Sequence, residues 1–194
     1  MPVRAVFLVG FMASGKSSVG QELARRLDWD FVDLDARIEA RERQTIPEIF
    51  RDRGESGFRV AETSALRDLA QSLERDTVVA LGGGAFSQPE NRELLQPWRS
   101  VFLETPLDEL WQRSLEDARE RPLRKDRTGF ARLYEYRLPF YRQATMTVVT
   151  SGKNPASLCA EIERRLQLEG LKGKSCSSQG PAHPSADFET GESQ

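Results

Sequence analysis

Short apolar runs alternate with helically spaced apolar positions along most of the chain. The runs are typical of parallel strands that are buried on both faces. They fall at residues 3–9, 29–35, 77–81, 99–104 and 146–150. Between them, apolar residues recur three or four positions apart, as on one side of a helix. This alternation predicts a three-layer, doubly wound α/β domain, in which helices cover both faces of a five-stranded parallel sheet.

Local signals predict several helix boundaries. Thr45 and Glu48 form a capping-box pattern with Pro47 in the first turn, so a helix is expected to begin there. Gly54 interrupts the helical spacing, and a longer helix is expected after it. Pro106 is expected to open another helix, and the turn at 151–155 to lead into the last one.

Composition and charge exclude several classes of protein. The chain has 28 basic and 30 acidic residues, a net charge of −2, so no general basic field favours nucleic acid. No apolar run has the length of a membrane span, and no signal-peptide pattern is present. With two cysteines, Cys159 and Cys176, a structural disulfide is not expected. We therefore expect a cytoplasmic, monomeric protein without membrane or nucleic-acid partners.

The most informative motif directly follows the first apolar run. Residues 10–17 read Gly-Phe-Met-Ala-Ser-Gly-Lys-Ser and fill every fixed position of G-x-x-x-x-G-K-[ST]. The helix N-terminus expected there offers unpaired N–H groups and a partial positive charge to phosphates. Lys16 is expected at the β- and γ-phosphates and Ser17 on Mg²⁺. The alternative is a Gly/Ser turn before an ordinary helix.

Two acids end the second apolar run. Strand alternation would place Asp33 and Asp35 on the same face, near the phosphate loop. A kinase needs one acid for Mg²⁺ and one for the acceptor hydroxyl. The alternatives are a solvated strand end or a helix cap formed by Asp35. The only histidine, His183, lies near the C-terminus, so acid–base work in the folded part would fall to carboxylates.

A triple glycine and two arginines complete the candidate chemistry. Gly82–Gly84 directly follow the third strand and would let a ligand approach closely, unless they form only a loose turn. Arg59 stands three residues before Glu62 and can pair with it, or can be an ordinary surface cation. Arg137 lies on the apolar side of its helix and requires an anionic partner, either a protein carboxylate or a substrate carboxylate.

Two segments differ in composition from the rest. Residues 116–127 are dense in charge and cannot bury an apolar face. A run of this kind is commonly a solvated loop, but between two helices of a phosphate-binding protein we interpret it as a lid. Residues 169–194 are rich in Gly, Ser, Pro and Gln and are expected to be a disordered tail, which leaves residues 1–168 as the kinase domain.

Taken together and in order, these motifs resemble the shikimate kinase family over nearly all of residues 1–168. The phosphate loop alone is common to many nucleotide-binding proteins, whereas the ordered D-x-D, G-E-x-x-F-R, G-G-G and R-P-L set is much more specific. The matching residues are 10–17, 33–35, 38–39, 46–50, 54–55, 58–59, 62, 82–84, 121–123, 137, 139 and 141.

The resemblance implies ATP-dependent, Mg²⁺-requiring phosphorylation of the 3-hydroxyl of shikimate, which yields shikimate 3-phosphate and ADP in aromatic amino-acid (chorismate) biosynthesis. It also implies the nucleoside-monophosphate-kinase-like P-loop fold with strand order 2-3-1-4-5. The acceptor would be held by Asp35, Arg59, Gly83, Gly84 and Arg137. The metal would be held by Ser17 and Asp33. ATP would contact Gly10, Ala13, Ser14, Gly15, Lys16, Ser17, Ser18, Arg121 from the lid, and Lys153 near the adenine. The catalytic residues would be Lys16, Asp35 and Arg121.

Two residues depart from the family pattern, and two other readings stay open. Ala13 stands where many relatives carry Gly, which would restrict the loop if φ must be positive. Arg124 stands where an apolar residue is common. One alternative is a kinase for another hydroxy acid, such as gluconate. The other is a nucleotide-dependent switch or inactive relative, although the sequence has no N-K-x-D motif and retains Lys16, Asp33 and Asp35.

Overall fold

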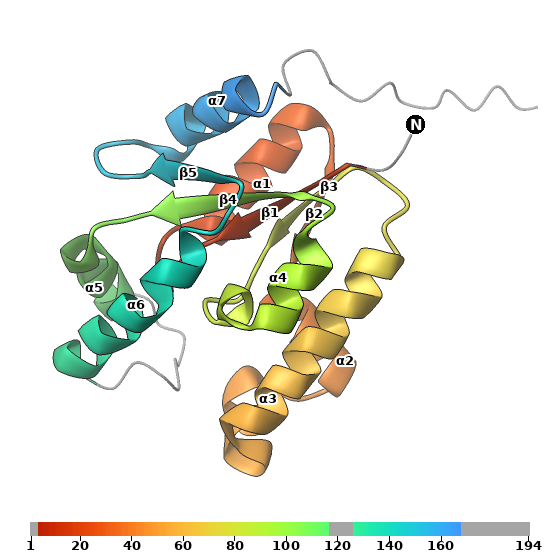
Figure 1. The fold of residues 1–194 in the computed structure, drawn as a ribbon, viewed down its shortest axis with the longest axis vertical. Helices are drawn as coiled ribbons and strands as arrows, with labels where there is room; N and C mark the ends of the chain where they lie inside the picture. The colour runs from red at the N-terminus through yellow and green to blue at the C-terminus, as the bar shows by residue number, and fades with distance from the viewer. Residues whose placement is uncertain (1–3, 117–125, 168–194) are drawn as a thin grey trace, which may run out of the picture.

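The computed structural model describes residues 4–116 and 126–167, arranged as a sheet between two layers of helices (Figure 1). The sheet has five parallel strands in the order β2-β3-β1-β4-β5. The predicted fold class and the strand order implied by the resemblance are therefore confirmed. The strands are β1 (Ala5–Val9), β2 (Asp30–Asp33), β3 (Thr77–Ala80), β4 (Arg99–Glu104) and β5 (Met146–Val149).

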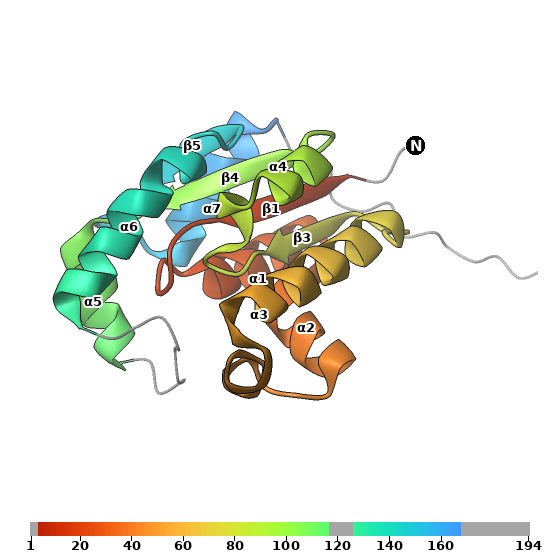
Figure 2. The ribbon, with the colours of Figure 1, turned by 60° about the horizontal axis from the view of Figure 1, so that its bottom comes forward.

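Side-chain alternation along the strands creates two separate cores. In β1, Phe7 and Val9 point to one face while Val6 and Leu8 point to the other, and all four are buried. Helices α1 and α7 cover the Val6 face, and α3, α4 and α6 cover the Phe7 face (Figures 1 and 2). The helices are α1 (Lys16–Leu27), α2 (Leu34–Glu42), α3 (Ile46–Gln71), α4 (Pro89–Leu95), α5 (Leu107–Glu116), α6 (Arg127–Tyr141) and α7 (Pro155–Arg165), with a 3₁₀ turn at Ala85–Ser87.

The predicted helix boundaries around α3 are confirmed. Thr45 caps α3, and both halves of its capping box with Glu48 are present. Gly54 has φ 67° and ψ −177°, so α3 consists of two helical segments joined at a kink. The 3₁₀ turn and α4 were not predicted; Pro89 in the first turn of α4 was the available signal.

The second strand is shorter than predicted, and this corrects the placement of Asp35. Strand β2 ends at Asp33, whose carboxylate accepts a hydrogen bond from the Asp35 backbone N–H at 3.0 Å and caps α2. Asp35 is therefore in the first turn of a helix, and the prediction that strand alternation places both acids on one face is wrong. A helix cap was the alternative left open, but Asp33 forms it, because its side chain reaches the free N–H groups of α2.

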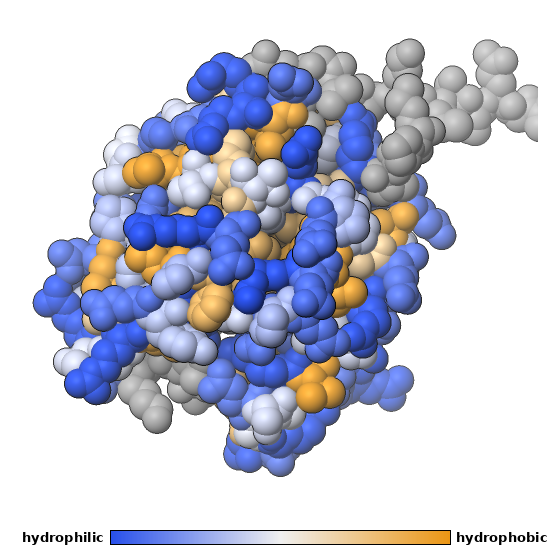
Figure 3. Space-filling model, in the orientation of Figure 1, coloured by the Kyte–Doolittle hydropathy of each residue, from blue (hydrophilic) through white to orange (hydrophobic). Residues whose placement is uncertain are grey.

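The face of the molecule shown in Figure 3 is mostly polar. On the face shown in Figure 3, hydrophobic side chains form small separate groups among hydrophilic ones. None of the helices in the described ranges is long and apolar enough to cross a membrane. The predicted lid lies largely outside the described residues, since only Glu116, Asp126 and Arg127 of it are placed, at the ends of α5 and α6. The predicted tail also lies outside them.

Candidate active site

Two adjoining pockets open at the carboxyl ends of the strands, where ligands bind in open α/β sheets. The larger has a volume of about 830 Å³ and the smaller about 380 Å³. Ser17, Asp33, Asp35 and Gly83 line both, so a group bound in one pocket can meet a group bound in the other. Of the predicted nucleotide residues, 13–18 and Lys153 line the smaller pocket, and the predicted acceptor residues line the larger one.

The predicted phosphate loop has the expected geometry. Gly10 has φ 154°, and Gly15, with φ 87°, is the residue before the first turn of α1. Lys16 Nζ donates to the carbonyls of Gly10 at 3.0 Å and Phe11 at 2.8 Å, so its side chain lies across the loop. Residues 13–18 line the smaller pocket. A phosphate held there would meet the N-terminal end of α1, as predicted.

The far wall of the smaller pocket comes from α5, α7 and the loop after β5. Lys153, which the resemblance places near the adenine, lines it, and its ammonium pairs with Glu161 at 2.6 Å. Arg113 and Pro155 also line it and were not predicted. The only signal for Arg113 was its place on the polar side of an amphipathic helix, which is the usual position of a surface arginine.

Ala13, which stands where many relatives carry Gly, has a positive φ of 62°. A left-handed conformation costs an alanine about 1–2 kcal/mol. Ala13→Gly would relieve this strain, but glycine also has a greater unfolded-state entropy, which offsets part of the gain. We therefore expect the free energy of unfolding to rise by about 0.5–1 kcal/mol and Tm to rise by about 1–3 °C. Ala40→Gly in α2 is the matched control and should lower Tm. Equal losses in both variants, measured by thermal unfolding, would show that Ala13 is not strained.

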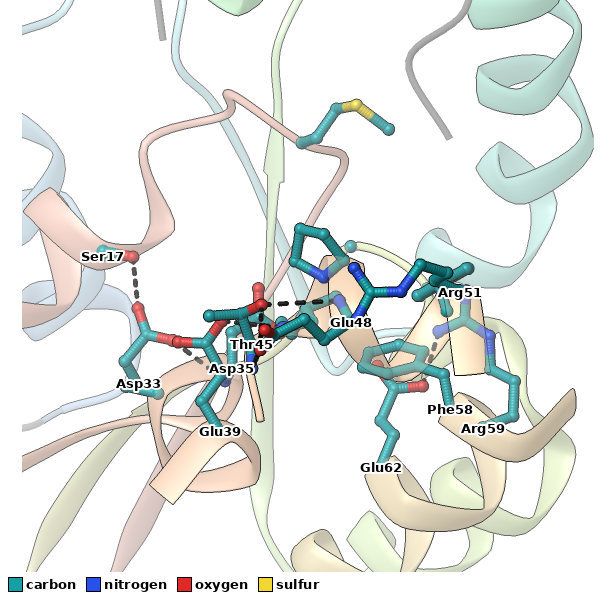
Figure 4. A pocket seen from close by; sticks show the side chains of 18 of the residues that line it. Ser17, Asp33, Asp35, Glu39, Thr45, Glu48, Arg51, Phe58, Arg59 and Glu62 are labelled. Carbon is teal, nitrogen blue, oxygen red and sulfur yellow. Dashed lines mark hydrogen bonds and ion pairs between the residues drawn. The ribbon is translucent and has the colours of Figure 1, made fainter. Parts of the chain in front are cut away.

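The residues predicted to hold Mg²⁺ are adjacent. Ser17 Oγ donates to Asp33 Oδ2 at 2.7 Å, next to the phosphate loop (Figure 4). Within the described ranges, no three or more His, Cys, Asp or Glu side chains are placed to hold a metal by themselves. This donor set fits Mg²⁺, which commonly takes one or two protein oxygens and completes its shell with phosphates and water.

The triple glycine makes room for charged side chains of the protein. A Cβ at Gly82 would lie 2.6 Å from Asp35 Oδ1 and 2.8 Å from Glu62 Oε1, and a Cβ at Gly84 would overlap the Arg59 guanidinium. The turn is ordered, since Ala85 N–H donates to Gly82 O at 3.1 Å. A loose turn is therefore excluded, and the glycines let three charged groups approach the backbone.

Arg59 and Glu62 form the predicted pair, and it is buried rather than on the surface. Arg59 Nη1 lies 2.7 Å from Glu62 Oε2, and Nη2 lies 3.0 Å from Glu55 Oε1. The Glu62 side chain is 0% exposed and Arg59 12%. Burial raises the pKa of Glu62, and the Arg59 guanidinium acts against that shift. Glu62 Oε1 and Arg59 Nε have no hydrogen-bond partner among the residues that the structure describes, so polar groups remain available at this wall.

Arg137 is buried and reaches the same wall from α6. Its Nη1 donates to Gly83 O at 3.2 Å, and its guanidinium lies 5.8 Å from the centre of the Phe11 ring. Among residues 4–116 and 126–167, no carboxylate forms an ion pair with Arg137. Of the two partners that the sequence allowed, a protein carboxylate is therefore not found in the described part of the chain.

Asp35 lies between the two residues predicted to hold Mg²⁺ and the wall formed by the two arginines. In Figure 4, Ser17 and Asp33 lie on one side of Asp35, with Arg59 and Glu62 on the other. All of these residues line the larger pocket, together with Gly83, Gly84 and Arg137. Of the predicted site, only Arg121, and with it the unusual Arg124, lies outside the described residues.

A family model described as shikimate kinase matches residues 12–167. A shikimate kinase of Geobacter metallireducens is 44% identical over 168 residues, which are 85% of this chain and 93% of the relative. A shikimate kinase of Persephonella marina is 38% identical over 166 residues, 85% of this chain and 100% of the relative.

A solved structure gives the same result in three dimensions. The structure of shikimate kinase from Acinetobacter baumannii in complex with shikimate aligns with a TM-score of 0.80 and 36% sequence identity, covering 88% of this chain and 96% of that one. Agreement in fold, in identity and over nearly the full length of the relatives excludes a match confined to the phosphate loop.

Proposed function

The chain belongs to the shikimate kinase family, and from that membership we propose that it transfers the γ-phosphoryl group of ATP to the 3-hydroxyl of shikimate. The products would be shikimate 3-phosphate and ADP, in a cytoplasmic step of aromatic amino-acid biosynthesis. One observation carries the proposal: Arg59, Arg137 and Asp35 converge on a pocket that shares its wall with the phosphate loop.

Acceptor recognition follows from the charge of the pocket wall. Shikimate is a carboxylate, and guanidinium groups bind carboxylates through paired, charge-assisted hydrogen bonds. Arg137 has no ion-pair partner within the described ranges, and Arg59 has an unpartnered Nε. Gly83 and Gly84 bring backbone next to these groups, so the acid end of the acceptor would lie against the triple-glycine turn.

The nucleotide and metal would occupy the neighbouring pocket. Residues 13–18 and Gly10 would surround the phosphates, with Lys16 at the β- and γ-phosphates and Lys153 near the adenine. Ser17 and Asp33 would hold Mg²⁺, which when bound neutralises phosphate charge. Arg121 would add a further positive charge from the lid.

Asp35 would act on the acceptor hydroxyl. It lines both pockets, so a hydroxyl beside it faces the phosphate loop. Phosphoryl transfer depends mainly on alignment and charge neutralisation, and a carboxylate at this point orients the hydroxyl and accepts its proton. Water, the competing acceptor, has to be excluded, and this is the role proposed for residues 116–127.

The decisive experiment is ADP release from ATP and Mg²⁺ with shikimate, with gluconate, and with no acceptor. We expect release with shikimate far above the other two arms. Faster ADP release with gluconate than with shikimate would support the alternative of a kinase for another hydroxy acid. Tight ATP binding without turnover in any arm would support a nucleotide-dependent binding protein.

A further inference from the structure

Tyr141 is the last residue of α6 and lies behind the pocket wall. Its side chain is completely buried, with its ring 5.3 Å from the ring of Phe102. Its hydroxyl donates a hydrogen bond to Gly83 O, in the triple-glycine turn. Burial raises the pKa of Tyr141 far above its ordinary value, so the hydroxyl remains a donor at any working pH.

The same carbonyl accepts a second hydrogen bond from the same helix. Arg137 lies four residues before Tyr141, one turn away on the same side of α6, and its Nη1 donates to Gly83 O at 3.2 Å. A carbonyl oxygen can accept two hydrogen bonds. Gly83 O is thus shared between a fixed hydroxyl and a guanidinium that has no ion-pair partner within the described ranges.

This sharing has a consequence for ligand binding. A guanidinium that turns toward an anion in the pocket has to break its hydrogen bond to the carbonyl. Breaking this bond costs more free energy if the carbonyl is then left without any donor. The Tyr141 hydroxyl keeps Gly83 O satisfied in either position of Arg137. The turn itself lies close against the phosphate loop, since a Cβ at Gly83 would lie 3.3 Å from Met12 N.

We propose that Tyr141 is a positioning residue for the acceptor: by holding Gly83 O, it allows the Arg137 guanidinium to exchange that carbonyl for the acceptor's carboxylate. This inference rests on the proposed function. Tyr141 itself does not line the larger pocket and is not expected to touch the acceptor.

Tyr141→Phe tests the proposal by removing only the hydroxyl. We expect the KM for shikimate to rise about tenfold, while the KM for ATP and kcat stay within about twofold. Tyr134→Phe is the matched control, because Tyr134 lies on the same helix and its hydroxyl donates to Thr105 O at 3.4 Å, away from the turn. The control should leave the KM for shikimate within about twofold.

A double variant separates positioning from a general structural role. In an Arg137→Ala background, Tyr141→Phe should lower kcat/KM by no more than about twofold, because there is no guanidinium left to release. An undiminished effect in that background would overturn the proposal, as would a loss of stability with no change in the KM for shikimate. Wild-type protein that fails to phosphorylate shikimate would instead overturn the proposed function itself, and this inference with it.

A measurement on the wild-type side chain keeps the test independent of how Tyr141→Phe folds. The chain has three tyrosines, so labelling tyrosine Cζ with ¹³C gives three resonances, assignable from Tyr134→Phe and Tyr136→Phe. Saturating shikimate should shift the Tyr141 resonance in the wild type and leave it unshifted in Arg137→Ala. An unchanged Tyr141 resonance in the wild type would contradict the exchange.

Discussion

Asp35→Asn is expected to lower kcat by a factor of about 10²–10⁴, with little change in the KM for ATP. The amide keeps the shape of the side chain but has neither the negative charge nor the ability to accept the hydroxyl proton. Asp35 lines both pockets and lies between the Ser17–Asp33 pair and Arg59 in Figure 4. Steady-state ADP release with shikimate, at saturating ATP, measures the effect.

Asp30→Asn is the matched control for this variant. Asp30 begins β2, the strand that leads into the helix carrying Asp35, at the opposite end of the sheet from the site, and pairs with Arg75 at 3.0 Å on the surface. Surface ion pairs of this kind contribute little to stability, so the variant should fold normally. Because Asp30 lies away from both pockets, kcat should also be unchanged. If Asp35→Asn retained more than about a tenth of the wild-type kcat, Asp35 would not be the group that activates the hydroxyl.

Arg137→Ala is expected to raise the KM for shikimate by about 30- to 150-fold while the KM for ATP stays nearly constant. Loss of charge-assisted hydrogen bonds to a carboxylate costs about 2–3 kcal/mol, and each 1.4 kcal/mol corresponds to a factor of ten. Arg137 is buried, and within the described ranges it donates to the Gly83 carbonyl and pairs with no carboxylate, so its removal leaves no described carboxylate without a partner. The variant should therefore fold.

Arg142→Ala provides the control from the end of the same helix. Arg142 is exposed and pairs with Glu104 at 3.3 Å, away from the larger pocket. Its removal should change neither KM. A loss of ATP affinity in Arg137→Ala, with the KM for shikimate intact, would mean that the acceptor pocket has been assigned to the wrong side of the phosphate loop.

Arg59 is a less direct probe of the same pocket. Its guanidinium is the ion-pair partner of Glu62, which is completely buried. Arg59→Ala would leave a buried carboxylate unpaired and is expected to cost about 3–5 kcal/mol of stability in addition to any effect on binding. The family resemblance assigned both arginines to the acceptor, and their different surroundings show why one variant reports on binding and the other also on folding.

Features encoded within a few neighbouring residues were predicted correctly. The phosphate loop, the capping box at Thr45 and the kink at Gly54 each depend on hydrogen bonds or backbone conformations that nearby residues determine. The strands were predicted because parallel strands buried on both faces require continuous apolar runs. The exception was the end of β2, where the Asp33 cap on α2 could not be distinguished by pattern from a further strand residue.

The sequence by itself determined the fold class, the phosphate loop and, through the family resemblance, five of the residues that line the larger pocket. Only the tertiary structure decided what those residues contact: that the glycines admit Asp35, Glu62 and Arg59, and that Arg137 and Tyr141 share the carbonyl of Gly83, which lies 54 and 58 positions earlier in the chain. The physical reason is the sequence separation over which each feature is determined. Periodicity and caps are set within one or two turns, whereas the partner of a buried polar group depends on which distant segments the folded sheet brings to the same edge.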